Sequence, residues 1–132
     1  MVLLDTHALI WWRAKSKRLS ARALKEMSRA RTLLVSPFSF WELAVLARKR
    51  RIQLDREMFQ WIEDTFADPR FQLAPFSATA AASAGLLGEA FGGDIADRFI
   101  YATARELAVP LITKDDAIRS FARSSGDVKT IW

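Results

Sequence analysis

Short apolar runs alternate with amphipathic stretches along most of this chain. The runs are too short for helices and lack the strict alternation of half-exposed strands, which predicts strands that are covered on both faces. Between them, apolar residues recur every three or four positions, as they do on one face of a helix. The predicted strands cover residues 2–4, 32–35, 71–76, 109–113 and 128–132. Strands separated by helices predict an α/β layer structure with a mainly parallel sheet.

The predicted helices begin at residues with clear start signals. Ser36 followed by Pro37 is one, because proline at the first helical position loses only an amide hydrogen that has no partner. This helix should run to about Arg50, and a helix of small residues over 78–90 should end at Gly92 and Gly93. The other helices are predicted from Thr6, from Ser20, over 56–67, from Asp94 and over 116–123.

Length and composition limit the classes of protein. With 132 residues, no repeat and no linker, the chain is predicted to form one domain over residues 1–132. Charged residues interrupt every apolar run before the roughly 20 residues of a membrane span, so no membrane association is expected. The N-terminus lacks a secretory pattern, which makes the cytoplasm the expected location. The absence of cysteine excludes a disulfide framework, a thiolate zinc site and a catalytic thiol.

Acidic residues recur where the predicted strands end. Asp5 follows the first strand, Glu42 lies in the helix after the second, Asp94 and Asp97 open a helix, and Asp115 follows a later strand. Each acid taken alone suits a helix cap or capping box, and Ser39 with Glu42 matches such a box. However, right-handed crossovers place the carboxyl ends of parallel strands along one edge of a sheet. We therefore expect these carboxylates to converge.

Converging carboxylates have a chemical consequence. They repel one another and raise one another's pKa unless a cation holds them ionised. Oxygen ligands without sulfur suit Mg²⁺ or Mn²⁺, and such ions support hydrolysis of phosphodiesters. The net charge of +5 and the pI of 10.1 favour a polyanionic partner such as nucleic acid. The combination of a basic protein and an acidic metal pocket therefore predicts a nuclease.

Four acidic motifs, at residues 2–12, 39–43, 94–98 and 111–115, follow one another along nearly the whole chain. In this order they resemble the motifs of PIN domains, and among these most closely the VapC-type toxins. The resemblance implies a PIN-like α/β/α sandwich with a central, mainly parallel sheet of four to five strands. It also implies a Mg²⁺- or Mn²⁺-dependent endoribonuclease that is the toxin of a toxin-antitoxin pair. A homodimer and a small VapB-like antitoxin that blocks the site are implied partners.

The resemblance carries catalytic and metal-binding roles onto Asp5, Glu42, Asp97 and Asp115. Asp97 lies at the family's distance before the Ala-Thr-Ala of the same helix, so it is the expected ligand. Asp94 lies one turn earlier and is expected to be a cap or an outer group. The usual proline of this motif is replaced by Ile95.

Further residues near these acids are secondary candidates. Thr6 suits either a helix cap or a bond to phosphate, and His7 suits a structural hydrogen bond better than a general base. Arg98 is expected to form an ion pair, and Asp116 matches a capping box with Thr113.

Arg13, Lys15, Arg48 and Lys49 are the main candidates for binding RNA, and Lys17 and Arg18 of the same first loop are comparable ones. The run 48–51 equally suits a solvated helix end, because a helix after a strand should run back from the ligand edge.

Two other interpretations stay open from the sequence. One is an inactive PIN scaffold that binds RNA or a protein partner. The other is a phospho-accepting receiver domain, which needs a nucleophilic aspartate at the end of a central strand. That interpretation is disfavoured, because the predicted second and third strands end at Ser36 and Phe76.

Overall fold

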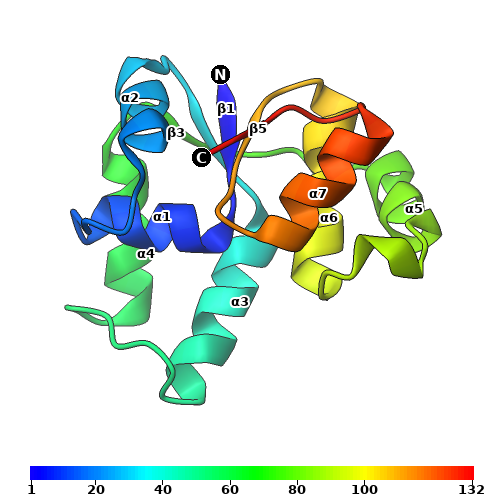
Figure 1. Ribbon diagram of the computed structural model, residues 1–132. Helices are drawn as coiled ribbons and strands as arrows, with labels where there is room; N and C mark the ends of the chain where they lie inside the picture. Colours follow the sequence, from blue (N-terminus) through cyan, green and yellow to red (C-terminus); the bar gives the residue numbers. More distant parts are fainter.

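Five short parallel strands form one sheet at the centre of the molecule. The structure is a computed structural model that describes residues 1–132. Their order in the sheet is β3-β2-β1-β4-β5, which makes β1 the central strand (Figure 1). Leu3 on β1 pairs with Leu34 on β2 and with Leu111 on β4. The strands are β1 (Val2–Leu4), β2 (Leu33–Val35), β3 (Phe71–Leu73), β4 (Leu111–Ile112) and β5 (Thr130–Ile131). The prediction of a parallel α/β sheet is confirmed.

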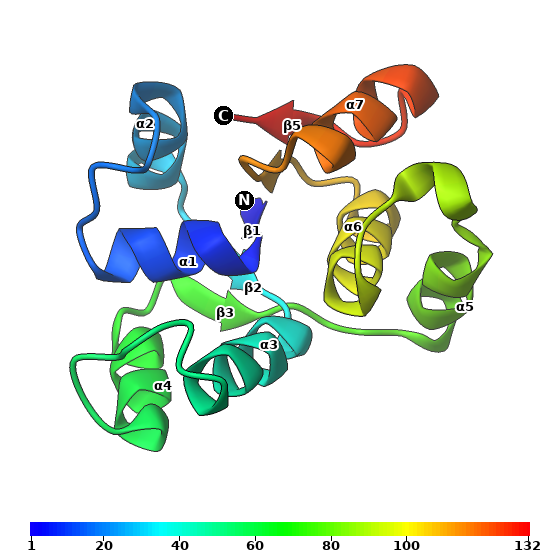
Figure 2. The same cartoon turned by 60° about the horizontal axis from the view of Figure 1, so that its bottom comes forward.

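Helices cover both faces of this sheet (Figure 2). They are α1 (Thr6–Arg13), α2 (Ala21–Arg29), α3 (Pro37–Arg48), α4 (Met58–Ala67), α5 (Ala78–Leu86), α6 (Ile95–Leu107) and α7 (Asp116–Ser125), with a 3₁₀ turn η1 (Glu89–Phe91). Val2 and Leu4 point into a core shared with α1, α2 and α4, whereas Leu3 points into a second core shared with α6 and α7. Successive residues of a strand face opposite sides, so β1 joins the two halves. None of the helices is long and apolar enough to cross a membrane.

The helix predicted over 78–90 is shorter than expected. It ends at Leu86, and the chain continues through η1, where Gly92 adopts φ +70°. Arg98 donates to the carbonyl oxygens of Leu87 and Gly88, and Phe91 is fully buried beside α6 and α7. These contacts between residues distant in sequence end α5 at Leu86. Without them, the small residues of this segment would favour a longer helix.

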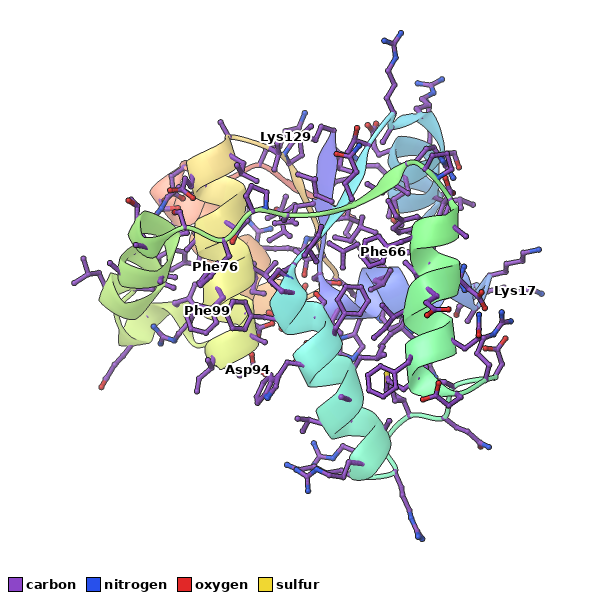
Figure 3. The ribbon with its side chains drawn as sticks, turned by 180° about the vertical axis from the view of Figure 1, so that it is seen from behind. Lys17, Phe66, Phe76, Asp94, Phe99 and Lys129 are labelled. Carbon is purple, nitrogen blue, oxygen red and sulfur yellow. The ribbon has the colours of Figure 1, made fainter.

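Helix α3 leaves the sheet in an unexpected direction. Figure 1 and Figure 3 show it continuing past the carboxyl edge of β2 rather than returning along the sheet. The expectation that this helix runs back was therefore wrong. Its contacts with α1 and α6 hold its first turns at the edge of the sheet, while Arg48 and Lys49 lie at its far end.

Candidate active site

Five carboxylates meet in a cleft of about 510 Å³ at the carboxyl edge of the sheet. They belong to Asp5, Glu42, Asp94, Asp97 and Asp115, so the structure brings together all the acids that the motifs singled out. Asp5 directly follows β1, Asp115 follows β4, and the other three come from α3 and the start of α6. The remaining residues of the lining are Thr6, His7, Trp11, Arg18 and Lys114.

Three of the acids are also helix caps. Asp5 Oδ1 accepts from the Ala8 amide at 2.7 Å, and Asp115 Oδ1 accepts from the Ile118 amide at 2.9 Å. Asp94 caps α6 through the Asp97 amide at 2.9 Å. A cap fixes the direction of a carboxylate but uses only one of its oxygens in each of these bonds. Capping and convergence are therefore compatible properties of the same residues.

Asp97 completes a capping box with Asp94. Its Oδ2 accepts from the Asp94 amide at 3.2 Å, so each aspartate holds the other in place. The two predicted boxes of Ser39 with Glu42 and Thr113 with Asp116 are absent, because Ser36 caps α3 and Asp115 caps α7. Glu42 consequently has no capping role.

An aromatic cluster sets Glu42 opposite these aspartates. The Phe38 ring of α3 lies 4.2 Å from the Phe99 ring of α6 and 4.7 Å from the Phe76 ring, measured between centroids. Figure 3 shows Phe76 and Phe99 beside the first turns of α3, with Asp94 nearby. This packing presses the start of α3 against α6, one turn away from Glu42.

The carboxylates of Glu42, Asp94 and Asp97 form the tightest group. One oxygen from each lies within 4.8 Å of the others. Burial, followed by the charge of Asp94 and to a lesser extent of Glu42, raises the pKa of Asp97 to about 7. Burial also raises the pKa of Glu42, against the effect of the Thr6 hydroxyl. Without a cation, this group therefore does not keep all its charges at neutral pH.

Asp5 and Asp115 form a second group in the same cleft. Asp5 is only 7% exposed, and this burial raises its pKa, to which the charge of Asp115 contributes. The Thr113 hydroxyl and the Ala8 amide oppose the rise.

The donor set fits a hard divalent cation. It consists of carboxylate oxygens, it contains no sulfur, and none of the five acids forms an ion pair with lysine or arginine. A cation bound there would offset the repulsion that raises these pKa values. The cleft can therefore hold a divalent metal.

We expect Gly93→Ala to damage this cleft. A Cβ atom at Gly93 would lie 2.5 Å from Phe91 Cε1 and 2.9 Å from Asp97 Cβ. Because Phe91 is fully buried, the strain should cost about 1–3 kcal/mol and displace Asp97. Thermal denaturation measures the loss.

Gly85→Ala is the matched control for Gly93→Ala. A Cβ atom at Gly85, in α5, meets nothing within 4 Å, so this change should be neutral or stabilising by up to about 1 kcal/mol. Equal melting temperatures for the two variants would contradict the proposed strain at Gly93.

Two secondary candidates lie outside the cleft. The expected ion pair of Arg98 is wrong, since its guanidinium donates to the carbonyl oxygens of Leu87 and Gly88. The Asp116 side chain is 97% exposed and lies 3.5 Å from Arg119.

Thr6 and His7 do line the cleft. However, Thr6 is not a helix cap, and His7 does not form a structural hydrogen bond. Asp5 caps α1 in place of Thr6, whose hydroxyl donates to Ser39 Oγ at 3.1 Å. His7 makes no side-chain hydrogen bond, and its ring packs 5.5 Å from that of Trp11.

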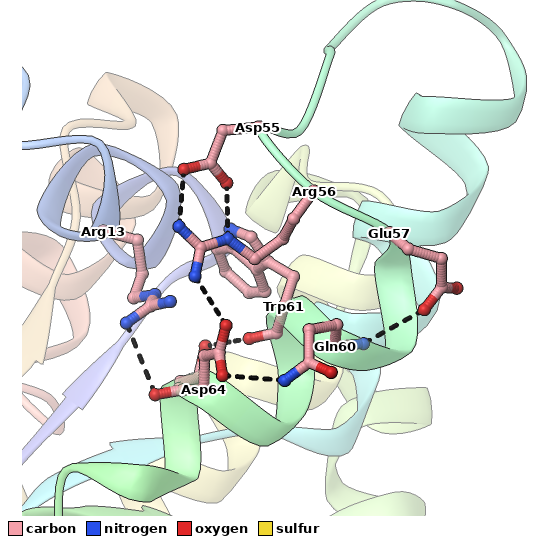
Figure 4. Close-up of polar contacts among 8 residues, drawn as sticks. Arg13, Asp55, Arg56, Glu57, Gln60, Trp61 and Asp64 are labelled. Carbon is pink, nitrogen blue, oxygen red and sulfur yellow. Dashed lines mark hydrogen bonds and ion pairs between the residues drawn. The ribbon is translucent and has the colours of Figure 1, made fainter.

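None of the four main candidates for RNA binding lines the acidic cleft, whereas Arg18 of the first loop does. Arg13 lies over the Trp61 ring at 5.3 Å and donates to the Asp64 carbonyl at 3.5 Å, beside the ion pairs of Arg56 (Figure 4). Lys15 lines a separate depression beside α2, and Arg48 and Lys49 lie at the far end of α3. The cations that do line the cleft are Arg18 and Lys114.

The comparison with protein families decides the family. A family model described as the PIN domain matches residues 2–124. This chain belongs to the PIN domain family. The PIN chain is 41% identical over 119 residues to a protein named Ribonuclease VapC22 from Mycobacterium tuberculosis, with 90% of each chain covered. The identification of a VapC-type PIN domain is thus confirmed.

Solved structures show the same fold. VapBC2 from Rickettsia felis, bound to a DNA fragment from their promoter, matches with a TM-score of 0.67 and 16% identity over 98% of this chain and 97% of that chain. A toxin-antitoxin complex from Klebsiella pneumoniae matches with a TM-score of 0.60 and 22% identity over 87% of both chains. The PIN-like α/β sandwich is therefore established for this chain.

Proposed function

We propose that this PIN domain is a toxin endoribonuclease that hydrolyses RNA phosphodiester bonds with Mg²⁺ or Mn²⁺ held by Asp5, Glu42, Asp97 and Asp115. The observation that carries the proposal is the convergence of these acids, without basic partners, at one edge of the sheet. The 41% identity to a protein named as a ribonuclease supports RNA as the substrate.

The chain's own groups supply orientation. Main-chain amides of Ala8, Asp94 and Ile118 each fix one oxygen of an aspartate, so the carboxylates are aimed before any ligand arrives. The packing of Phe38 on Phe99 does the same for Glu42. A divalent cation held by these carboxylates would supply activation of a water molecule and stabilisation of the negative charge on the leaving oxygen. Asp94 serves as the cap that keeps Asp97 in position.

The same relatives also support protein partners for this chain. The solved structures with the same fold include toxin-antitoxin complexes. This likeness supports a small antitoxin as the regulator of this chain. We infer a VapB-like protein that covers the cleft, and a homodimer of the toxin. Size-exclusion chromatography with light scattering measures the mass of the free chain and of its complex.

Brief induction of the chain in cells that lack the antitoxin tests this function. Growth should stop, and sequencing should reveal new RNA 5′ ends at a limited set of positions. Asp5→Asn should abolish both effects, because it removes one carboxylate charge and retains an oxygen that can accept from Ala8. Normal growth with abundant wild-type protein would contradict the toxin role.

A further inference from the structure

We propose that Arg18 and Lys114, held against the ring of Trp11, bind the RNA backbone next to the scissile phosphodiester. This inference rests on the proposed ribonuclease function and concerns the same cleft. Both cations line the cleft together with the five acids, although they come from different parts of the chain. Arg18 lies in the loop between α1 and α2, and Lys114 lies between β4 and Asp115.

Trp11 positions the two cations. Its ring centroid lies 5.9 Å from the Arg18 guanidinium carbon and 5.7 Å from Lys114 Nζ, which is within the range of cation–π attraction. The ring is itself fixed, because it packs 5.5 Å from the His7 ring and 5.7 Å from the Trp132 ring. The Trp11 ring is therefore occupied by its contacts with the two cations and is not available for stacking with an RNA base.

The donors of both cations are available to a ligand. Neither residue forms an ion pair, although five carboxylates line the same cleft. By contrast, Arg56, Arg70, Arg105 and Arg119 are each paired with an aspartate. Arg18 and Lys114 are also exposed to solvent. Their charges are therefore free to meet phosphate oxygens.

The charge of the cleft explains why such cations are needed. A strand of RNA brings a negative charge at every nucleotide, and the acids repel the phosphates that are not at the metal site. Two cations on the wall of the same cleft offset this repulsion where the strand enters or leaves. Arg48 and Lys49 do not have this position, because they lie at the far end of α3.

RNA binding by a double variant, Arg18→Ala with Lys114→Ala, tests the inference. Both changes are made in Asp97→Asn protein, and fluorescence anisotropy of a labelled single-stranded RNA gives Kd at several salt concentrations. We expect Kd to rise roughly 10- to 50-fold, and the slope of log Kd against log salt to fall by about 1.4, since each lost phosphate contact contributes about 0.7. Arg48→Ala with Lys49→Ala, a change of equal charge, is the control and should alter neither quantity by as much.

Kinetics in otherwise wild-type protein separate binding from chemistry. The Arg18 and Lys114 double variant should raise KM by a similar factor while kcat stays within about threefold. Trp11→Leu should also raise KM, and Trp11→Phe should restore it, because phenylalanine retains a ring face.

Each outcome of these experiments is decisive. Unchanged Kd and salt slope in the Arg18 and Lys114 variant would overturn the inference and leave the ribonuclease function intact. If wild-type protein cleaves no RNA while the double variant still weakens RNA binding, the proposed function fails, and only the contact of Arg18 and Lys114 with the RNA backbone stands.

Discussion

Asp97→Asn should lower the rate of Mg²⁺-dependent RNA cleavage roughly 10³-fold while the protein stays folded. Asp97 belongs to the tightest group of carboxylates and is the member whose pKa is raised to about 7 by burial and by its acidic neighbours. Asparagine keeps an oxygen for the Asp94 amide, so the capping box can persist. The rate of cleavage of a labelled RNA, together with a melting curve, measures both parts of the prediction.

Asp116→Asn is the control for this substitution. It removes the same charge one residue after Asp115, but the side chain is 97% exposed and lies outside the cleft. Its activity should match wild type. Asp94→Asn should cost less activity than Asp97→Asn, because asparagine caps a helix as well as aspartate does. Full activity in Asp97→Asn protein would contradict the assignment of the acidic quartet.

Saturating Mn²⁺ should strongly stabilise the fold. At 100 times its Kd, a ligand that binds only the folded state raises the free energy of unfolding by about 2.7 kcal/mol, which corresponds to roughly 10 °C for a domain of this size. The same addition should do much less for Asp97→Asn protein. Thermal denaturation with and without the metal measures the difference, and equal shifts in both proteins would place the metal elsewhere.

The stabilisation by metal should depend on pH. Folding raises the pKa of Asp97 from 3.8 to about 7, so the folded metal-free protein binds more protons than the unfolded chain between these values. This contribution to stability is fully present below about pH 4 and is lost as pH rises through about 7. The metal-free protein should therefore lose more stability than Asp97→Asn protein between pH 5 and 8. Consequently, Mn²⁺ should raise the melting temperature more at pH 8 than at pH 5.

Much of the fold could be predicted because its signals are local. Short apolar runs such as residues 2–4 favour buried strands, and Ser36 followed by Pro37 is a local signal for a helix start. The end of α5 could not be predicted, since the contacts of Arg98 and Phe91 across the sequence decide it. The direction of α3 likewise depends on its packing against α6.

The acids of the cleft were predictable for a related reason. A parallel sheet brings strand ends together, so the positions of Asp5 and Asp115 after β1 and β4 place them at one edge. The receiver interpretation is not supported, because the family model of the PIN domain matches residues 2–124 of this chain.

The cations near the cleft were not predictable in the same way. A basic run shows where charge lies along the chain, whereas the fold decides which side chain faces the acids. Arg18 lies in the basic loop between α1 and α2, and Lys114 precedes Asp115. Only their packing against Trp11 shows that they line the acidic cleft, whereas Arg13 and Lys15 do not.

Cleavage of RNA by the purified chain, freed of any partner, tests the central claim most directly. The rate is measured with excess EDTA and again after excess Mg²⁺ or Mn²⁺ is added. Because the proposed mechanism depends on a cation held by Asp5, Glu42, Asp97 and Asp115, we expect no cleavage in EDTA and full recovery with the metal. Cleavage that proceeds equally well in EDTA would contradict the account.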